Sequence, residues 1–446
     1  MLAFVIALVL VLGVNTILWT VVGLVRYARL RAGVATIARR RSGWRAVGPG
    51  PDDATGAEYA PPTVADVAIL VAAHDEELVI ENTIRSAAEH LPLAQVFVVS
   101  DGSTDDTVRI ATGAGAQVYD LHPNRGKAGA LAAAIDHFRI PERFEVLMLL
   151  DADTHLAPDY FSTGLAEFSA PDIVAVAGRA TTILDPAAPT LLGRVLVAYR
   201  ERVYVAVQYL QKFGQAAEHA NVVAIVPGFA SMYRTRVLGD IDITAAGLAI
   251  EDFNMTFEVH AKRLGRIAFR PSAAIAYTQD PDTLGDYAKQ IRRWNLGFWQ
   301  TLRRHRLGFG RFGLAVAMFV AELLTSSLMM LAILPAVALA LVAAVLDASG
   351  IGGSVPRTML EADPVLGIVV GVLLPDYVLT LLVAVVARRP VYVLFGVVFP
   401  LLRILDAFLC IAALVMAFRG GSNGVWHSPT RRSLGAGPPA TARAEH

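Results

Sequence analysis

The strongest constraint on the fold is a set of long apolar runs near the two ends of the chain. Residues 2–25 contain no charged side chain, and further apolar runs cover 312–346, 365–387 and 391–418. Because a helix rises about 1.5 Å per residue, each run is long enough to cross a hydrocarbon core of roughly 30 Å. Charged residues make up only 17% of the chain, whereas soluble proteins carry about 25%. These features predict a membrane protein.

The charges that follow the first apolar run predict its orientation. Seven arginines and no acidic residue lie between positions 26 and 45. Basic residues favour the cytoplasmic side, so we expect the N-terminus outside and the following segment in the cytoplasm. A cleaved signal peptide would carry its basic residues before a shorter apolar run. We therefore interpret residues 1–25 as a retained anchor in a multi-pass protein of the inner (cytoplasmic) membrane.

The rest of the chain divides by composition. We expect a basic juxtamembrane segment and linker at 26–63, a cytoplasmic domain with interfacial helices at 64–310, a C-terminal transmembrane block at 311–419 and a flexible tail at 420–446. The tail is rich in Gly, Pro, Ser and Ala, a composition that does not form a packed core.

The charges around the transmembrane block leave its topology open. Arg388 and Arg389 indicate a cytoplasmic turn, and the acidic stretch 347–363 indicates an outside loop. Three simple crossings would leave the tail outside, although its arginines favour the inside. An interfacial or re-entrant piece near Pro400 would resolve this conflict, and so would a hairpin within 312–346.

Charge and cysteine content exclude other classes. The chain has 39 basic and 39 acidic residues, and this neutral balance gives no support for a nucleic-acid partner, for which a basic face is typical. Its single cysteine, Cys410, rules out a disulfide-stapled scaffold. We interpret Cys410, which lies in an apolar run, as a packing residue.

The middle of the chain has the pattern of an α/β domain. Short apolar runs predict strands at 67–73, 95–100, 117–121 and 146–150, and helical patterns lie between them at 76–90, 105–112 and 127–138. Strands that alternate with helices predict a Rossmann-like, mostly parallel sheet covered on both faces. In such sheets, ligands bind beyond the carboxyl ends of the strands.

Three of the predicted strands end in acidic clusters. These are His74-Asp75-Glu76-Glu77, the run from Asp101 to Asp106, and Asp151-Ala152-Asp153. Each alone is also typical of a turn or a helix cap. Carboxylates gathered at one sheet edge repel one another, so together they predict a cation at this edge. Hard oxygen ligands suit Mg²⁺ or Mn²⁺, which keep positions open for phosphate and water.

At this point the chain resembles a known family. The three clusters, Asn124-Arg125-Gly126-Lys127, Glu251-Asp252 and Gln290-Ile291-Arg292-Arg293-Trp294 follow the order of motifs in family 2 glycosyltransferases. The resemblance covers about 66–305 and looks closest to the membrane-embedded, often processive branch of poly-N-acetylglucosamine, hyaluronan, chitin and cellulose synthases. It implies a GT-A fold for the cytoplasmic domain. The first motif departs from the usual Asn-Glu-Glu, and Pro227-Gly228-Phe229-Ala230-Ser231 only loosely matches the acceptor motif.

The resemblance implies roles for individual residues. Asp252 is the expected base that takes the proton from the acceptor hydroxyl, with Glu251 beside it. Asp153 and Asp151 are the expected metal ligands. The other expected substrate-binding residues are Ala73, Glu76, Glu77, Asp101, Lys127, Gly228, Gln290, Arg293 and Trp294, together with Asp151. Plainer alternatives remain, namely a solvated helix-start lysine for Lys127 and a first-turn acid favoured by the helix dipole for Asp252.

Three functions are compatible with these patterns. The first is an inverting hexosyl- or N-acetylhexosaminyltransferase that adds sugars from a UDP-sugar to a growing polysaccharide, with an N-acetylglucosamine-type polymer favoured. Synthesis could be coupled to export, with an export partner that receives the chain. The second is a transferase that adds one sugar to a lipid-linked acceptor. The third is a binding or export component whose transferase fold has lost activity.

Two further helices and a few charges complete the expectations. We expect a helix over 283–305, placed at the membrane surface among lipids by its arginines and aromatics. Residues 191–213 are interpreted as a second interfacial helix or an ordinary amphipathic surface helix. Within the apolar block, Glu322, Asp376, Arg403 and Asp406 would face a protein interior or a watery path such as a polymer tunnel. Alternatively, Arg403 and Asp406 form a structural pair.

Overall fold

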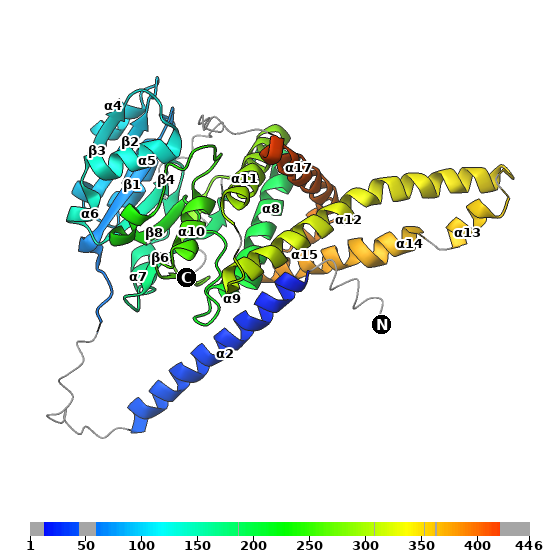
Figure 1. The fold of residues 1–446 in the computed structure, drawn as a ribbon, viewed down its shortest axis with the longest axis horizontal. Helices are drawn as coiled ribbons and strands as arrows, with labels where there is room; N and C mark the ends of the chain where they lie inside the picture. Colours follow the sequence, from blue (N-terminus) through cyan, green and yellow to red (C-terminus); the bar gives the residue numbers. More distant parts are fainter. Residues whose placement is uncertain are drawn as a thin grey trace.

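The computed structural model describes residues 13–43, 59–185, 187–306, 308–351, 353–361 and 364–419. Residues 1–12 of the expected anchor, residues 44–58 of the expected juxtamembrane segment and linker, and the expected tail lie outside these residues. A sheet-containing domain occupies one end of the molecule, and long helices extend away from it at the other end (Figure 1).

The domain is built on a seven-stranded sheet of order β3-β2-β1-β4-β8-β6-β9. Its strands are β1 (Val67–Ala73), β2 (Val96–Asp101), β3 (Gln117–Leu121), β4 (Val146–Asp151), β6 (Ile173–Val176), β8 (Ala230–Arg234) and β9 (Arg266–Ala268). The first four pair in parallel, as expected. β8 runs antiparallel to both β4 and β6, and was not predicted. The α/β fold class and the mostly parallel sheet are confirmed.

Alternate residues of β1 enter the two halves of the core, because side chains of a strand point to opposite faces. Val67, Ile69 and Val71 pack on one face, which is covered by α3 (Ile80–Ala88), α4 (Thr107–Gly113) and α7 (Tyr160–Leu165). The other face is covered by α5 (Gly126–His137), α6 (Ile140–Arg143) and α10 (Asp252–Ala261). Helix α3 begins four residues later than expected. Glu76 lies in the turn before the helix, where its backbone N–H donates to Thr107 Oγ1 of α4 at 2.8 Å.

A second, three-stranded sheet of order β5-β10-β7 lies beside the first. It consists of β5 (His155–Leu156), β10 (Ile275–Thr278) and β7 (Arg179–Thr182). This three-stranded sheet was not predicted, because its strands are two to four residues long and carry no alternating pattern.

The short helical turns of the domain are η1 (Val64–Asp66), η2 (Leu93–Gln95) and η4 (Thr235–Asp240).

Residues 191–213 form a buried helix. Helix α8 (Leu191–Val205) continues through a π-helical segment, η3 (Ala206–Lys212), into α9 (Phe213–Gln215). The interpretation as an ordinary surface helix is wrong, because Arg200 is 1% exposed and Arg202 is 3% exposed. Both arginines are instead paired with buried carboxylates of other elements.

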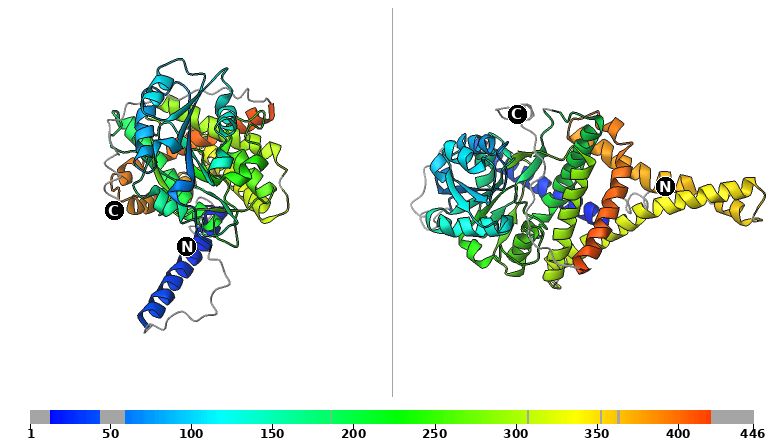
Figure 2. Two further views of the ribbon diagram at one scale, coloured as in Figure 1. Left: turned by 90° about the vertical axis from the view of Figure 1, so that its left-hand side faces the viewer. Right: turned by 90° about the horizontal axis from the view of Figure 1, so that it is seen from above.

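Helix α11 (Leu284–Arg304) matches the helix expected over 283–305. Thr283, the residue before the helix, caps it, because its hydroxyl accepts a hydrogen bond from the N–H of Asp286. α8, α11 and the C-terminal helix α17 (Phe399–Arg419) lie side by side at the end of the domain, and α17 runs crosswise to α12 (right-hand view of Figure 2).

Three of the described helices are long and apolar enough to cross a membrane: Arg311–Ala348, Leu366–Val386 and Phe399–Arg419. The first is the single continuous helix α12, so the hairpin considered for 312–346 is wrong. The second comprises α14 (Pro364–Ile368), η5 (Val369–Leu373) and α15 (Leu374–Val386). α13 (Val355–Glu361) precedes it, and α16 (Tyr392–Phe395) separates it from α17.

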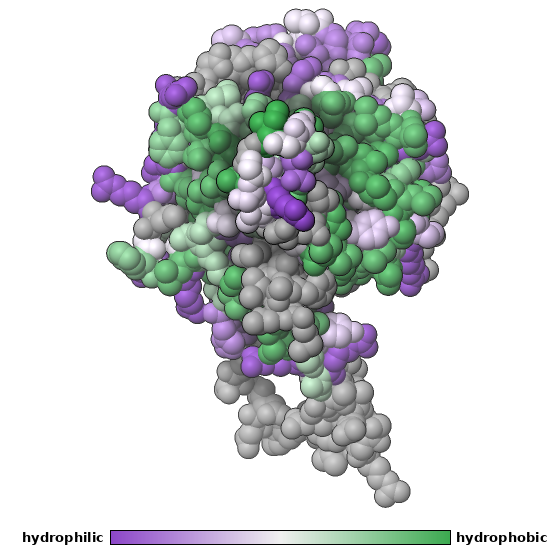
Figure 3. Space-filling view, turned by 90° about the vertical axis from the view of Figure 1, so that its right-hand side faces the viewer, coloured by the Kyte–Doolittle hydropathy of each residue, from purple (hydrophilic) through white to green (hydrophobic). Residues whose placement is uncertain are grey.

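Apolar side chains gather on the face that these helices present (Figure 3). On α12 they include Leu314, Leu328, Leu334, Leu341 and Val345, each of which is at least 58% exposed. Such a large exposed apolar surface marks a membrane or protein contact. The N-terminal helix α2 (Val14–Gly43) joins this group, because Glu322 of α12 accepts a hydrogen bond from the N–H of Asn15 at 2.7 Å.

The charges in the apolar block face the protein interior. Arg403 donates to Asp376 at 2.6 Å and to Ser326 at 3.0 Å, and Arg202 of α8 donates to Asp376 at 2.5 Å. Asp406 accepts hydrogen bonds from the hydroxyls of Tyr199 and Tyr287. The predicted direct Arg403–Asp406 pair is therefore wrong, because each residue bonds to other helices. Cys410 is buried, as its interpretation as a packing residue expects.

Candidate active site

A cavity of about 930 Å³ lies between the sheet domain and the apolar helices. Its walls come from the carboxyl ends of β1 and β4, the start of α5, the α8–η3 helix, α10 and α11. At its far end it reaches α12 and α17, through residues such as Phe319, Ser326, Arg403 and Asp406. Nine of the residues singled out from the sequence line this one space: Glu76, Lys127, Asp151, Asp153, Glu251, Asp252, Gln290, Arg293 and Trp294.

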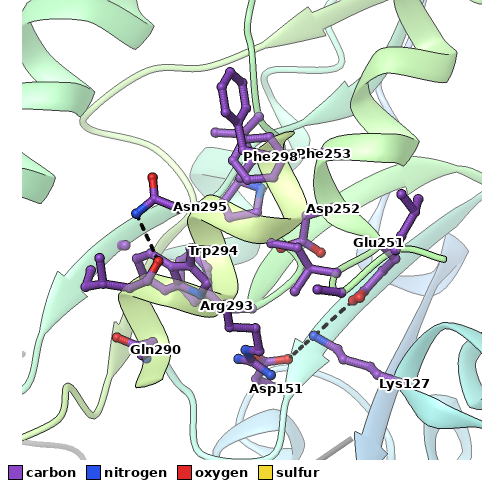
Figure 4. Close-up of a pocket in the computed structure, with 18 of the residues that line it drawn as sticks. Lys127, Asp151, Glu251, Asp252, Phe253, Gln290, Arg293, Trp294, Asn295 and Phe298 are labelled. Carbon is purple, nitrogen blue, oxygen red and sulfur yellow. Dashed lines mark hydrogen bonds and ion pairs between the residues drawn. The ribbon is translucent and has the colours of Figure 1, made fainter. Parts of the chain in front are cut away.

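Lys127 lies at the centre of the acidic side of the cavity. Lys127 is the second residue of α5, and its Nζ lies 2.7 Å from Asp151 Oδ1 and 3.2 Å from Glu251 Oε1 (Figure 4). Burial alone would lower the pKa of Lys127, but the charges of Asp151, Glu251 and Asp252 outweigh burial and raise it. Burial likewise works to raise the pKa of Glu251, and the charge of Lys127 reverses this and holds it below its usual value. A solvated lysine is thereby excluded.

Asp252 is the first residue of α10, beside Glu251. One carboxylate oxygen, Oδ2, accepts the N–H of Gly228 at 2.8 Å. The other, Oδ1, is buried without a hydrogen-bond partner among the described residues. Burial, together with the negative charge of Glu251, raises the pKa of Asp252 to about 7, although Lys127 and the Gly228 N–H oppose the shift. A carboxylate with a pKa near neutral pH and one oxygen without a hydrogen-bond partner suits proton transfer.

Asp151 and Asp153 follow β4 and both line the cavity, where Asp153 is 5% exposed. Among the described residues, no three or more His, Cys, Asp or Glu side chains are grouped to hold a metal ion by themselves. Two carboxylates fit a hard cation that takes its remaining ligands from a diphosphate and from water. The donor set therefore fits Mg²⁺ or Mn²⁺ in the presence of a nucleotide.

Four predicted residues do not line the cavity. Ala73 is a buried residue of β1 paired with Ser100 of β2. The carboxylate of Glu77 accepts the N–H of Asp106 in the next loop. Gly228 contacts Asp252 through its backbone only.

Asp101, the fourth of these residues, fixes the loop before α5. Its Oδ1 accepts the N–H of Arg125 at 2.7 Å, and its backbone carbonyl accepts from Asn124. Asp101 is fully buried. It therefore positions the loop that carries Lys127.

Helix α11 brings Gln290, Arg293 and Trp294 to the opposite wall (Figure 4). The Gln290 Oε1 is buried without a hydrogen-bond partner among the described residues. The guanidinium of Arg200, on α8, stacks 4.3 Å from the centre of the Trp294 ring. Arg200 is itself held by Asp280 and Tyr204. The indole is thus fixed by a residue that the sequence analysis did not select.

Two charged residues of the cavity, Arg200 and Lys212, were not selected as site residues from the sequence. Arg200 carries no signal, because the chain is rich in arginine and its partners are distant in sequence. Lys212 does carry a signal in the sequence, because lysine is rare in this chain. The four lysines are Lys127, Lys212, Lys262 and Lys289.

Comparisons with known proteins agree with the domain. The family described as Glycosyltransferase like family 2 matches residues 62–297, more than half of the chain. Among solved structures, a mannosyltransferase from Pyrobaculum calidifontis in complex with GDP-Man and Mn²⁺ is 18% identical. It covers 90% of this chain and 99% of its own, with a TM-score of 0.47.

Two further structures are similar over part of the chain. Glucosyl-3-phosphoglycerate synthase from Mycobacterium tuberculosis is 17% identical over 54% of this chain and 80% of its own, with a TM-score of 0.36. The 1–349 fragment of S. aureus TarS is 16% identical over 58% of this chain and 71% of its own, with a TM-score of 0.37. The search of curated proteins found no match.

Proposed function

The chain belongs to the glycosyltransferase-like family 2, and from this premise we propose that it moves a sugar from a UDP-sugar to an acceptor hydroxyl beside Asp252, with inversion. It is a glycosyltransferase that uses a nucleotide sugar. The observation that carries the proposal is a half-buried aspartate, Asp252, whose Oδ1 has no hydrogen-bond partner among the described residues and which lines the same cavity as Asp151, Asp153 and Lys127.

The donor binds at the acidic side of the cavity. The loop of Asn124–Gly126, held by Asp101, and the carboxyl ends of β1 and β4 bound this side. Mg²⁺ or Mn²⁺ held by Asp151 and Asp153 would neutralise the diphosphate that leaves. Lys127 gives up its contact with Asp151 and donates to the diphosphate, and Arg293 adds positive charge from the opposite wall.

The acceptor hydroxyl binds at Asp252 Oδ1. As its oxygen attacks the anomeric carbon, its proton passes to Asp252 and the bond from that carbon to the diphosphate oxygen breaks. One displacement at this carbon inverts its configuration. Gln290 and Trp294 lie on the α11 wall, where they orient the acceptor sugar.

The acceptor enters from the membrane side. The cavity extends from Asp252 to Ser326 and Asp406 on the apolar helices, so a growing glycan, such as an N-acetylglucosamine-type polymer on its way to an export partner, has a route along it. A single addition to a lipid-linked acceptor uses the same opening. Loss of activity is disfavoured, because Lys127, Asp151, Glu251 and Asp252 are all present and line one cavity.

We infer that α12 and the α14–α15 helix cross the inner membrane and that α17 lies along its cytoplasmic surface. α17 packs against α11 of the domain through Phe298, Trp299, Cys410 and Ala413. Its crosswise direction relative to α12 supports this placement (Figure 2). The domain and Arg419 are then on the cytoplasmic side, as the basic residues favour.

A donor screen with product-length analysis tests the proposal. Protein purified in detergent is given labelled UDP-sugars with Mg²⁺ or Mn²⁺, and products are separated by size. Long products support polymer synthesis, and a single sugar on a lipid supports the second candidate. The proposal fails if no UDP-sugar is either transferred or hydrolysed.

A further inference from the structure

Lys212 is a buried cation without a counter-ion. It ends the π-helical segment η3, is 5% exposed and lines the cavity. Within the described part of the chain its ammonium makes no hydrogen bond or ion pair. Its Nζ lies over the face of the Phe269 ring, 5.3 Å from the ring centre. A buried ammonium without a partner is costly, so charged side chains are normally paired.

Lys212 and Asp252 line the same cavity. Lys127 is paired there with Asp151 and Glu251, whereas Lys212 forms no ion pair with any described acid. Burial lowers the pKa of Lys212 to about 8, and the charge of Asp252 opposes this lowering. The acid whose charge reaches Lys212 is thus the proposed base for the acceptor hydroxyl.

The neighbours of Lys212 do not neutralise it. The side chain of Gln208, four residues before Lys212, already bonds to Ala180 of β7. Its amide oxygen accepts the N–H of Ala180, and its amide nitrogen donates to the carbonyl of Ala180. Ile225 and Pro227 contribute apolar surface to the wall of the same cavity. An incoming anion would thus find an ammonium with free donors in surroundings of low polarity, where charge attraction is strong.

We propose that Lys212 binds a phosphate group of the acceptor, next to the hydroxyl that Asp252 deprotonates. This rests on the proposed transferase function and adds the substrate class: a phosphate-bearing acceptor. A single ammonium is a compact point charge that suits the concentrated negative charge of a phosphate. The phosphate belongs either to a lipid headgroup that enters past α12 and α17 or to a soluble phosphate ester.

Thermal unfolding with matched probes tests the assignment. The soluble pair is glycerol 3-phosphate and glycerol, and the lipid pair, in mixed micelles, is phosphatidylglycerol and diacylglycerol. We expect a phosphate member to raise the Tm of the native protein by about 2–4 °C at saturation. The neutral members leave the Tm unchanged. Which phosphate member acts, the soluble or the lipid one, identifies the source.

Variants separate this role from folding and from donor binding. Lys212→Met should lose the phosphate-induced shift and have an equal or higher Tm without probe, because a buried unpaired charge is removed. Lys212→Arg should keep at least part of the shift. Lys289→Met, which changes an exposed lysine paired with Asp286, should behave like the native protein.

Two results overturn the assignment: no phosphate probe stabilises the native protein, or the shift persists in Lys212→Met. The shift caused by UDP with Mn²⁺ is measured on the same samples. If UDP does not bind, the proposed function fails, whereas the phosphate result still reports on Lys212.

Discussion

Gly228 has no side chain at a point where the carboxylate of Asp252 fills the space. A Cβ added to Gly228 would lie 2.3 Å from Asp252 Oδ1. Gly228→Ala should therefore displace the carboxylate and lower the transfer rate about 100-fold, since a shift of about 1 Å is enough for such a loss. UDP affinity, measured by calorimetry, should stay within about twofold because the donor side is untouched.

Gly285→Ala is the matched control, because a Cβ at Gly285 meets no atom within 4 Å. It should transfer sugar at the native rate. Native activity in Gly228→Ala would show that the position of Asp252 is not critical.

The charge state of Asp252 predicts a pH dependence. Burial and the charge of Glu251 raise its pKa to about 7, and only the ionised form accepts a proton. The value of kcat/KM should therefore rise with pH through about 7 and fall below it. Saturating divalent metal should move this rise of kcat/KM to lower pH, because a nearby cation favours the ionised form of Asp252. A rate that is independent of pH between about 5.5 and 8.5 would contradict the role of Asp252 as base.

At the scale of elements, α8 holds the site through one buried ion pair. Arg200 and Asp280 are both at most 4% exposed, and Arg200 also stacks on Trp294. Arg200→Met would leave the Asp280 carboxylate buried without its cation and should lower the free energy of unfolding by about 3–5 kcal/mol. Adding Asp280→Asn should recover much of this loss. Chemical unfolding in detergent measures both, and simple additivity of the two changes would contradict the pairing.

The sequence could predict the elements whose signal is local. β1 and β4 are continuous apolar runs, and their polar ends, near Glu76 and Asp151, could be expected to meet because parallel strands share an edge. β8 and the second sheet could not be predicted, because their strands are short and depend on distant partners. The same holds for Arg200, whose partner Asp280 lies eighty residues away, and for the π-helical segment that aims Lys212 into the cavity.

At the scale of the whole molecule, the proposed topology puts both the domain and the C-terminus inside. In a Cys410→Ser background, Ser349→Cys at the end of α12 should react with an impermeant thiol reagent in intact cells. Lys262→Cys and Arg388→Cys should react only after the membrane is opened, because they lie on the domain side. A C-terminal tag should likewise be protected from external protease. Cleavage of that tag in intact cells would show that α17 crosses the membrane.

The central claim is that Asp252 is the base in a nucleotide-sugar transferase. The most direct test is to measure UDP binding and sugar transfer on Asp252→Asn, which keeps the shape of the side chain and removes its basicity. The account predicts native UDP affinity and a loss of transfer of about 100-fold or more, with Asp240→Asn, near the end of η4 and exposed, unaffected. Transfer by Asp252→Asn at close to the native rate would contradict the account.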